Sequence, residues 1–247
     1  MALVTDPRFP GGTASAVAAE IEAIAPHVDL SLHGLETEMF KDRPMNPALE
    51  RAVTAMGVPV VWNPSVVRAD LVVFHNPACL KFNLDLPLRL SCERGVVVTH
   101  ENFLRPNGSE GFDIDKCLGF LRDAFVCSDP QLAPVSDYNR SGVREWARRE
   151  AADWRLAKWN WFNICAHPIV PPTTTPRDRR GRHSRPGFEK FPSADIMAAH
   201  FPSHAEHCAI LGADALLDGG DPVPKHWRTH RFGEREVDAF LREIDFF

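Results

Sequence analysis

Three short groups of residues follow apolar runs and could contact a ligand. They are Gly11-Gly12-Thr13, His75-Asn76 and His100-Glu101-Asn102. A histidine at the end of a strand can hydrogen-bond a hydroxyl group, transfer a proton or pair within the core. For His100 the position favours a ligand contact and a core pair about equally. For His75 the following Pro77 favours a fixed turn.

The glycine pair and Thr13 suit an anion. Apolar residues recur at helical spacing from Ala14 to Ala25 on a face that includes Glu20, so a helix is predicted there with Thr13 as its N-cap. The N-terminus of a helix presents unpaired N–H groups and the positive end of the helix dipole. The alternative is a plain tight turn, because two glycines are weaker than the three-glycine dinucleotide motif.

A basic segment in the second half of the chain is the third candidate for chemistry. It contains Arg182, Arg185 and Lys190 between Gly181 and Pro192. Arginine and lysine side chains can hold a diphosphate, the arginine through its planar guanidinium group. The alternative is a solvated basic linker.

Motifs for several other chemistries are missing. The sequence has no P-loop lysine and no Gly-x-Ser-x-Gly elbow of an α/β-hydrolase. His200, His204 and His207 could share one helical face, but Pro202 interrupts it. No metal site is therefore predicted.

The amino-acid composition is that of an ordinary soluble protein with a hydrophobic core. The chain has 247 residues, of which 44% are hydrophobic and 25% charged, enough for one large or two modest domains. A net charge of −5 argues against general nucleic-acid binding. The six cysteines are widely spaced and indicate free thiols in a reducing compartment. No segment resembles a membrane span or signal peptide, so we expect a cytoplasmic protein, with contact to a membrane surface left open.

The elements that must position these groups alternate along the first part of the chain. Strands are predicted at 3–5, 28–33, 58–62, 71–74, 95–99, 124–127, 133–136 and 159–164, and helices at 14–25, 47–56, 114–121 and 138–152. Strands that are apolar at every position are typical of a parallel sheet covered on both faces. The alternation predicts a doubly wound, Rossmann-like α/β sheet, whose ligands bind at the carboxyl ends of the strands.

The second half restarts the alternation after a proline-rich segment. We predict a Rossmann-like domain at 1–166, a linker at 167–178 and an incomplete second Rossmann-like domain at 179–247. The second domain is expected to contain a helix at 193–199, a strand at 207–211 and a helix at 234–242. Residues 244–247 are expected to form an unpaired strand that leaves an apolar edge uncovered.

Taken together, these features resemble a bacterial retaining glycosyltransferase of the glycosyltransferase-B fold, in the group called family 1 or family 4. The shared parts are the Gly-Gly-Thr turn, strands ending in His75-Asn76 and His100, the proline-rich hinge, and Gly181-Arg182-x-x-Arg185 followed by Lys190. The resemblance implies a nucleotide-sugar donor held between two Rossmann-like domains.

The resemblance also implies a role for individual residues. Gly11, Gly12 and Thr13 would contact the donor diphosphate, and His100 would be the catalytic residue that touches the transferred sugar. Arg182 and Lys190 would neutralise the departing diphosphate without a metal. His75, Asn102 and Arg185 are further pocket candidates.

The expected function is transfer of a sugar from a nucleotide-diphosphate-sugar to a glycan, lipid or protein acceptor, with no cofactor beyond the donor. In the family the second domain continues to a Glu-x7-Glu segment, which this sequence does not reach before Phe247. An inactive remnant or a non-catalytic binding module of the same fold is therefore the alternative. A nucleotide-sugar epimerase of that fold is a third, weaker one.

Overall fold

The computed structural model describes residues 1–83, 85–105, 107–164, 174–185, 187, 191–220 and 222–247. The chain divides into two compact units, Met1–Ala166 and His167–Phe247, and each is described by itself. Residues 167–173 of the predicted linker, together with Cys165 and Lys190, lie outside the described residues.

The first unit is built on an eight-stranded sheet in which every pairing is parallel. The strand order is β3-β2-β1-β4-β5-β7-β8, and β6 pairs with β5. The strands are β1 (Ala2–Thr5), β2 (Ser31–Gly34), β3 (Val60–Trp62), β4 (Val66–His75), β5 (Arg89–Thr99), β6 (Phe125–Val126), β7 (Gln131–Pro134) and β8 (Arg155–Leu156). This is the predicted parallel α/β, Rossmann-like topology.

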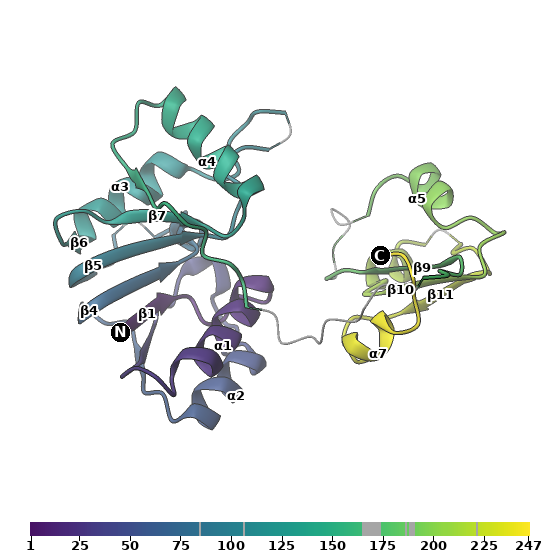
Figure 1. Ribbon diagram of the computed structural model, residues 1–247, viewed down its shortest axis with the longest axis horizontal. Helices are drawn as coiled ribbons and strands as arrows, with labels where there is room; N and C mark the ends of the chain where they lie inside the picture. Colours follow the sequence, from purple (N-terminus) through teal and green to yellow (C-terminus); the bar gives the residue numbers. More distant parts are fainter. Residues whose placement is uncertain (84, 106, 165–173, 186, 188–190, 221) are drawn as a thin grey trace. The chain divides into compact units, whose positions relative to one another are not determined.

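Helices cover both faces of this sheet, α1 and α2 on one side and α3 and α4 on the other (Figure 1). They are α1 (Gly12–Ile24), α2 (Pro47–Met56), α3 (Ile114–Ala124) and α4 (Asp137–Arg149), with short 3₁₀ turns η1 (Glu38–Phe40) and η2 (Pro77–Leu80). Neighbouring strand residues point into opposite layers: Leu3 packs with the α1 and α2 side, whereas Val4 packs with the α3 and α4 side. Burial on both faces explains the uninterrupted apolar runs.

Two predictions in the first unit are wrong. Gly11, not Thr13, is the N-cap of α1, and Thr13 lies inside the first helical turn. Residues 159–164 do not form a strand; the last strand is β8. The Arg140 guanidinium donates to the carbonyl oxygens of Ala157 and Trp159, so a side chain takes the backbone acceptors that a strand would have used.

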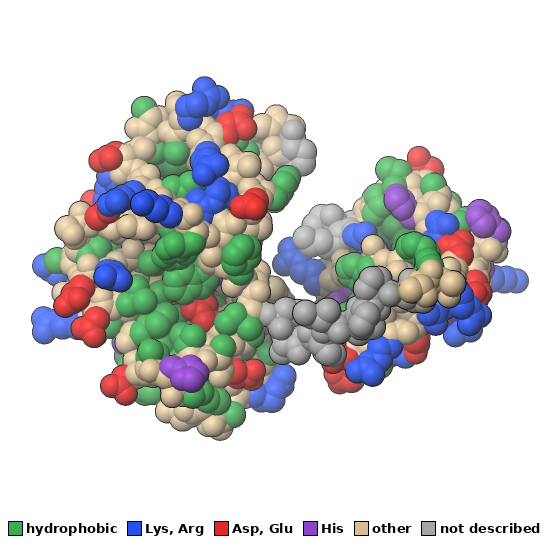
Figure 2. Space-filling view, viewed as in Figure 1, with side chains coloured by type: hydrophobic (Ala, Val, Ile, Leu, Met, Phe, Trp, Pro, Cys, Tyr) green, Lys and Arg blue, Asp and Glu red, His purple; other side chains and the backbone are tan. Residues whose placement is uncertain are grey.

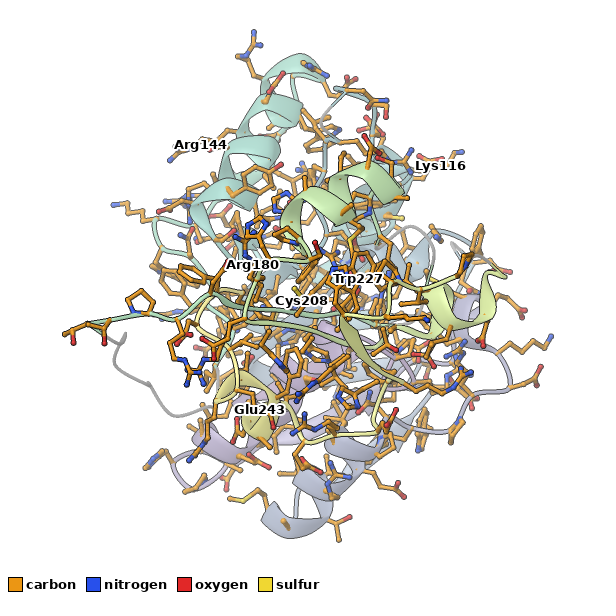
Figure 3. The ribbon with its side chains drawn as sticks, turned by 90° about the vertical axis from the view of Figure 1, so that its right-hand side faces the viewer. Lys116, Arg144, Arg180, Cys208, Trp227 and Glu243 are labelled. Atoms are coloured by element: carbon orange, nitrogen blue, oxygen red, sulfur yellow. The ribbon has the colours of Figure 1, made fainter. Side chains whose placement is uncertain are left out.

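The second unit contains a three-stranded parallel sheet in the order β11-β10-β9. Its elements are β9 (Arg179–His183), α5 (Ala194–His200), β10 (His207–Leu211), α6 (Asp214–Asp218), β11 (Trp227–His230) and α7 (Val237–Leu241). Met197 of α5 packs with Cys208 and Ile210 on one face, and Phe240 of α7 packs with Ala209 on the other. Arg180, Cys208 and Trp227 lie in register across the three strands (Figure 3).

The basic run, for which a solvated linker was the alternative interpretation, contains a strand, β9. Its charged residues have acidic partners, because Arg179 pairs with Asp245 and Arg180 pairs with Asp178. Gly181 allows close packing at the centre of the strand, since an added Cβ would lie 2.6 Å from Ile244. Asp178 is a neighbour in sequence, but Asp245 and Ile244 are more than 60 positions away, so the strand also depends on partners that are distant in sequence.

The end of the chain also differs from the prediction. Residues 244–247 were expected to leave an unpaired edge, but Phe246 forms a parallel bridge with Arg180. The N–H of Gly181 donates to the carbonyl of Phe246 at 2.8 Å, and the N–H of Asp245 donates to the carbonyl of Arg179 at 2.8 Å. The backbone of this edge is therefore paired, although the side chains of Phe246 and Phe247 remain exposed.

Within the described ranges, no helix is long and apolar enough to cross a bilayer, and no group of three or more His, Cys, Asp or Glu side chains could hold a metal ion. Cys79, Cys92, Cys117, Cys127 and Cys208 are free thiols. On the face shown in Figure 2, basic and acidic side chains are mixed over both units.

Candidate functional site

Polar side chains gather at the carboxyl ends of β1, β4 and β5. The order of the strands reverses at β1. β2 pairs with one edge of β1, and β4 pairs with the other. Ligands of open parallel sheets bind in the crevice at such a reversal. We call the side chains that meet there the switch-point cluster: Thr13, Glu20, His75, Asn76, His100 and Trp161.

The two histidines of the cluster are bonded to each other. His75 is the last residue of β4 and His100 follows β5, and Nδ1 of His75 lies 3.0 Å from Nε2 of His100. His75 is fully buried, and its pKa is well below the ordinary value because of burial and the nearby His100. Burial lowers the pKa of His100, which is partly exposed, to about 4. Both rings are therefore neutral at pH 7, and each has one N–H donor and one acceptor nitrogen.

A carboxyl group lies behind the histidine pair. Glu20 comes from the buried face of α1, and its Oε2 accepts a hydrogen bond of 2.9 Å from Nε1 of Trp161. The same oxygen lies 3.6 Å from Nε2 of the neutral His75 ring, too far for a hydrogen bond. Burial raises the pKa of Glu20 to about 7, against the lowering effect of the Trp161 hydrogen bond.

Asn76 connects the end of β4 to the first turn of α1. Its backbone is left-handed, with φ of 61°, a conformation that asparagine tolerates better than most residues. Its Nδ2 donates to Oγ1 of Thr13 at 3.5 Å, while its buried Oδ1 has no partner among the described residues. Glu20 Oε1 and His75 Nε2 are likewise buried without a partner in that part of the chain. Several unsatisfied buried polar atoms in one place are unusual and mark the cluster as a functional candidate.

The glycine turn beside the cluster is open. Gly11 has an extended backbone (φ −128°, ψ −165°) that any residue adopts, and its helix has no side-chain cap. Gly12 is exposed, and a Cβ added there would meet nothing within 4 Å. Backbone strain requires a glycine at neither position, and packing within the described residues does not require one at position 12, so close approach of a ligand remains a physical reason for Gly12.

A buried ion pair fixes the loop that leads into this turn. The carboxylate of Asp6 accepts hydrogen bonds from Nε and Nη2 of Arg8 at 3.0 and 2.9 Å. It also accepts from the backbone N–H of Thr37 at 3.1 Å and its hydroxyl at 2.7 Å. Arg8 in turn donates to the carbonyl of Thr37 at 2.8 Å. The loop is held by its own side chains and presents the glycines in one conformation.

The structure does not bring Asn102 into the cluster. Asn102 is exposed, and its Oδ1 accepts from Nδ2 of Asn139 at 3.3 Å. Asn139 also donates to the carbonyl of Glu101 at 2.8 Å and accepts from the hydroxyl of Thr99 at 2.7 Å. Asn102 thus belongs to a brace between the end of β5 and α4, and its role as a pocket residue remains a prediction.

The predicted cations belong to the second unit. Arg182 lies on β9, with its guanidinium carbon 5.4 Å from the ring centroid of Phe191, and Arg185 is exposed after the strand. Arg182 lines a cavity of about 850 Å³ in this unit, together with Arg180 and His200. Lys190 lies outside the described residues. The diphosphate-binding role of these cations remains a prediction.

Two members of the cluster were not recognised from the sequence. Glu20 gave a signal, because it is an acidic residue on the apolar face of a predicted helix, where a charge is costly unless it has a partner. Trp161 gave none, since it lies 141 positions from Glu20 and was assigned to a strand.

Comparison with known proteins adds no identification. No protein-family model matches the chain, and no curated protein matches it. The function must therefore be inferred from the geometry of the site.

Proposed function

We propose that this protein is a metal-independent glycosyltransferase of the glycosyltransferase-B type, which uses a nucleotide-diphosphate-sugar donor and retains the anomeric configuration. A pair of contacts at the reversal of a parallel sheet carries the proposal. His100 bonds to His75 at the end of β4, and Asn76, the next residue, bonds to Thr13 in the first turn of α1. Both features occupy the place where this class of sheet binds its ligands.

The chemistry of the cluster is consistent with binding a sugar. A neutral imidazole can accept from one hydroxyl group or donate to it, and the low pKa of His100 keeps the ring neutral near pH 7. The N-terminus of α1, a helix of 13 residues, offers backbone N–H groups and a positive dipole end to a diphosphate.

The departing nucleotide develops negative charge in the transition state, so fixed positive groups near it lower the barrier. In this proposal Arg182 and Lys190 contribute those charges, and Arg185 is a further pocket residue. The acceptor is a hydroxyl group on a glycan, lipid or protein.

The test uses the full chain and a panel of uridine, guanosine, adenosine and thymidine diphosphate sugars. Binding is measured by calorimetry, and turnover by release of the nucleoside diphosphate. We expect at least one donor to bind and be turned over, and His100→Ala to lower turnover more than donor affinity. His27→Ala, at an exposed position after α1, is the matched control and should change neither. Binding without turnover supports a non-catalytic binding module of the same fold. Binding of no donor overturns the proposal.

A further inference from the structure

A path of polar atoms leads from the protein interior to a partly exposed ring. It begins at Glu20 Oε2, crosses 3.6 Å to Nε2 of His75, and continues from Nδ1 of His75 over 3.0 Å to Nε2 of His100. Each histidine contributes both of its nitrogens, one on each side of the ring, and the 3.6 Å between Glu20 and His75 is the one step on the path that is longer than a hydrogen bond. The remaining nitrogen, Nδ1 of His100, has no hydrogen bond in the described part of the chain.

Glu20 Oε1 and His75 Nε2 are both buried without a partner among the residues that the structure describes, and a proton can cross between the two side chains once their 3.6 Å separation shortens to hydrogen-bond length. Two hydrogen-bond arrangements then satisfy the path when both rings are neutral. With Glu20 ionised, Nε2–H of His75 points to the carboxylate and Nε2–H of His100 points to Nδ1 of His75. Nδ1 of His100 is then an acceptor. With Glu20 protonated, its O–H points to Nε2 of His75 and Nδ1–H of His75 points to Nε2 of His100. Nδ1 of His100 then carries the proton and is a donor.

We propose that Glu20, His75 and His100 form a proton relay that stores a proton on Glu20 and thereby switches the outer nitrogen of His100 between acceptor and donor. The proton enters from water or from a ligand hydroxyl group as a new N–H bond at Nδ1 of His100. The Nε2–H bond of His100 breaks as Nδ1–H of His75 forms, and Nε2–H of His75 breaks as O–H of Glu20 forms. One proton is taken up, neither ring ends as an imidazolium, and reversal releases it.

The electrostatics of the site suit such a relay. Burial raises the pKa of Glu20 to about 7, so this group exchanges its proton near neutral pH. Burial lowers the pKa of both histidines, so they pass a proton on instead of keeping it. The groups that face Glu20 are His75 from β4 and the uncharged indole of Trp161, and His100 lies on the other side of the His75 ring. Glu50 and Arg51 of the neighbouring α2 are exposed. Two effects act on the pKa of Glu20: burial raises it, and the Trp161 hydrogen bond lowers it by a smaller amount.

The inference does not depend on sugar transfer. Glu20 and His75 act through His100, as positioning residues, and the relay exists whatever ligand His100 touches. Its failure and the failure of the glycosyltransferase proposal are therefore separate results, because one is observed in the free protein and the other requires a donor.

The experiment follows the histidine tautomers by nuclear magnetic resonance on the full chain with ¹⁵N-labelled histidine, from about pH 5 to about pH 9. In the wild type we expect the protonated nitrogen of His75 to change from Nδ1 to Nε2, and that of His100 from Nδ1 to Nε2, as the pH rises through a common midpoint near 7. His75→Asn and His100→Asn assign the signals. Glu20→Gln, which cannot ionise, should fix both tautomers over the whole range.

Glu22→Gln is the matched control, because Glu22 lies on the same helix but is exposed, and it should leave the midpoint unchanged. Tautomers that stay constant in the wild type, or a tautomer change that persists in Glu20→Gln, would overturn the relay. So would rings that become imidazolium near their ordinary pKa. If Glu20→Gln does not fold, the wild-type titration decides by itself.

Discussion

Nδ1 of His75 lies 3.0 Å from Nε2 of His100, although His75 ends β4, His100 follows β5 and the two are 25 positions apart. The parallel pairing of β4 with β5 makes this possible, because His75 is in register with Val98 and the strands end together. Each histidine thus fixes the ring of the other. Glu20 lies 3.6 Å from His75, and its raised pKa makes the free energy of unfolding depend on pH.

Glu20→Gln should change the pH dependence of stability. The pKa of Glu20 is raised from 4.5 to about 7, so between these values the unfolded chain ionises this group while the folded protein keeps the proton. The stability contributed by the protonated group is complete below pH 4.5 and is lost as pH rises through 7. The variant should therefore gain about 3 kcal/mol relative to the wild type over this interval. Urea denaturation at several pH values measures the difference, with Glu22→Gln as the control; a difference that is constant with pH contradicts the prediction.

His100→Gln should have the opposite effect on the acid side. The pKa of His100 falls from 6.5 to about 4 on folding, so between these values the unfolded chain binds a proton that the folded protein does not. This stability is present above pH 6.5 and is lost as pH falls through 4, by at most about 3 kcal/mol. The variant should lose less stability than the wild type on acidification. Denaturation curves across this interval test it, and His27→Gln, at an exposed position, should behave like the wild type.

Gly12→Ala should separate folding from binding. An added Cβ meets nothing within 4 Å, so the unfolding free energy should stay the same or rise by up to about 1 kcal/mol. If a diphosphate approaches this backbone, the methyl group should weaken uridine diphosphate binding by about tenfold, a change of 1.4 kcal/mol. Gly119→Ala is the matched control, because Gly119 is also helical and unobstructed but lies in α3. Equal affinity in both variants would show that the ligand does not contact Gly12.

Asp6→Ala should destabilise the first unit. Asp6 is 1% exposed and holds Arg8 and Thr37, and its removal leaves the buried Arg8 guanidinium without its carboxylate. Breaking a buried ion pair in this way costs about 3–5 kcal/mol. Asp29→Ala, at an exposed position, should be within about 0.5 kcal/mol of the wild type. Thermal and urea denaturation compare the two; similar losses in both would mean that the ion pair does not stabilise the loop.

The amide of Gly181 should exchange slowly with solvent. Its N–H donates to the carbonyl of Phe246, and Asp245 beside it pairs with Arg179. Asp245→Asn weakens this pairing, so exchange at Gly181 should become faster. Amide exchange monitored by nuclear magnetic resonance measures the effect, and Asp238→Asn in α7 serves as a control. Rapid exchange at Gly181 in the wild type would restore the expectation of an unpaired edge.

Local sequence patterns predicted the fold better than the site. The apolar runs at 71–74 and 95–99 lie within β4 and β5, because burial on both faces leaves a clear signal in neighbouring residues. β9 gave no such signal, since its arginines become compatible with a strand only through Asp178 and Asp245. His75 and His100 were found from their positions after strands, but their direct bond depends on strand register. The contact between Glu20 and Trp161 depends on the complete fold.

The hydrogen bond from Trp161 to Glu20 has a consequence for synthesis of the chain. The two residues are 141 positions apart, so α1 leaves the ribosome long before the indole that its buried carboxyl group requires. Until then Glu20 has to stay hydrated or bind a proton. While its carboxylate is hydrated, the inner face of α1 does not close fully onto the sheet. The first unit can therefore complete its core only after translation has passed residue 161, when nearly all of that unit has been made.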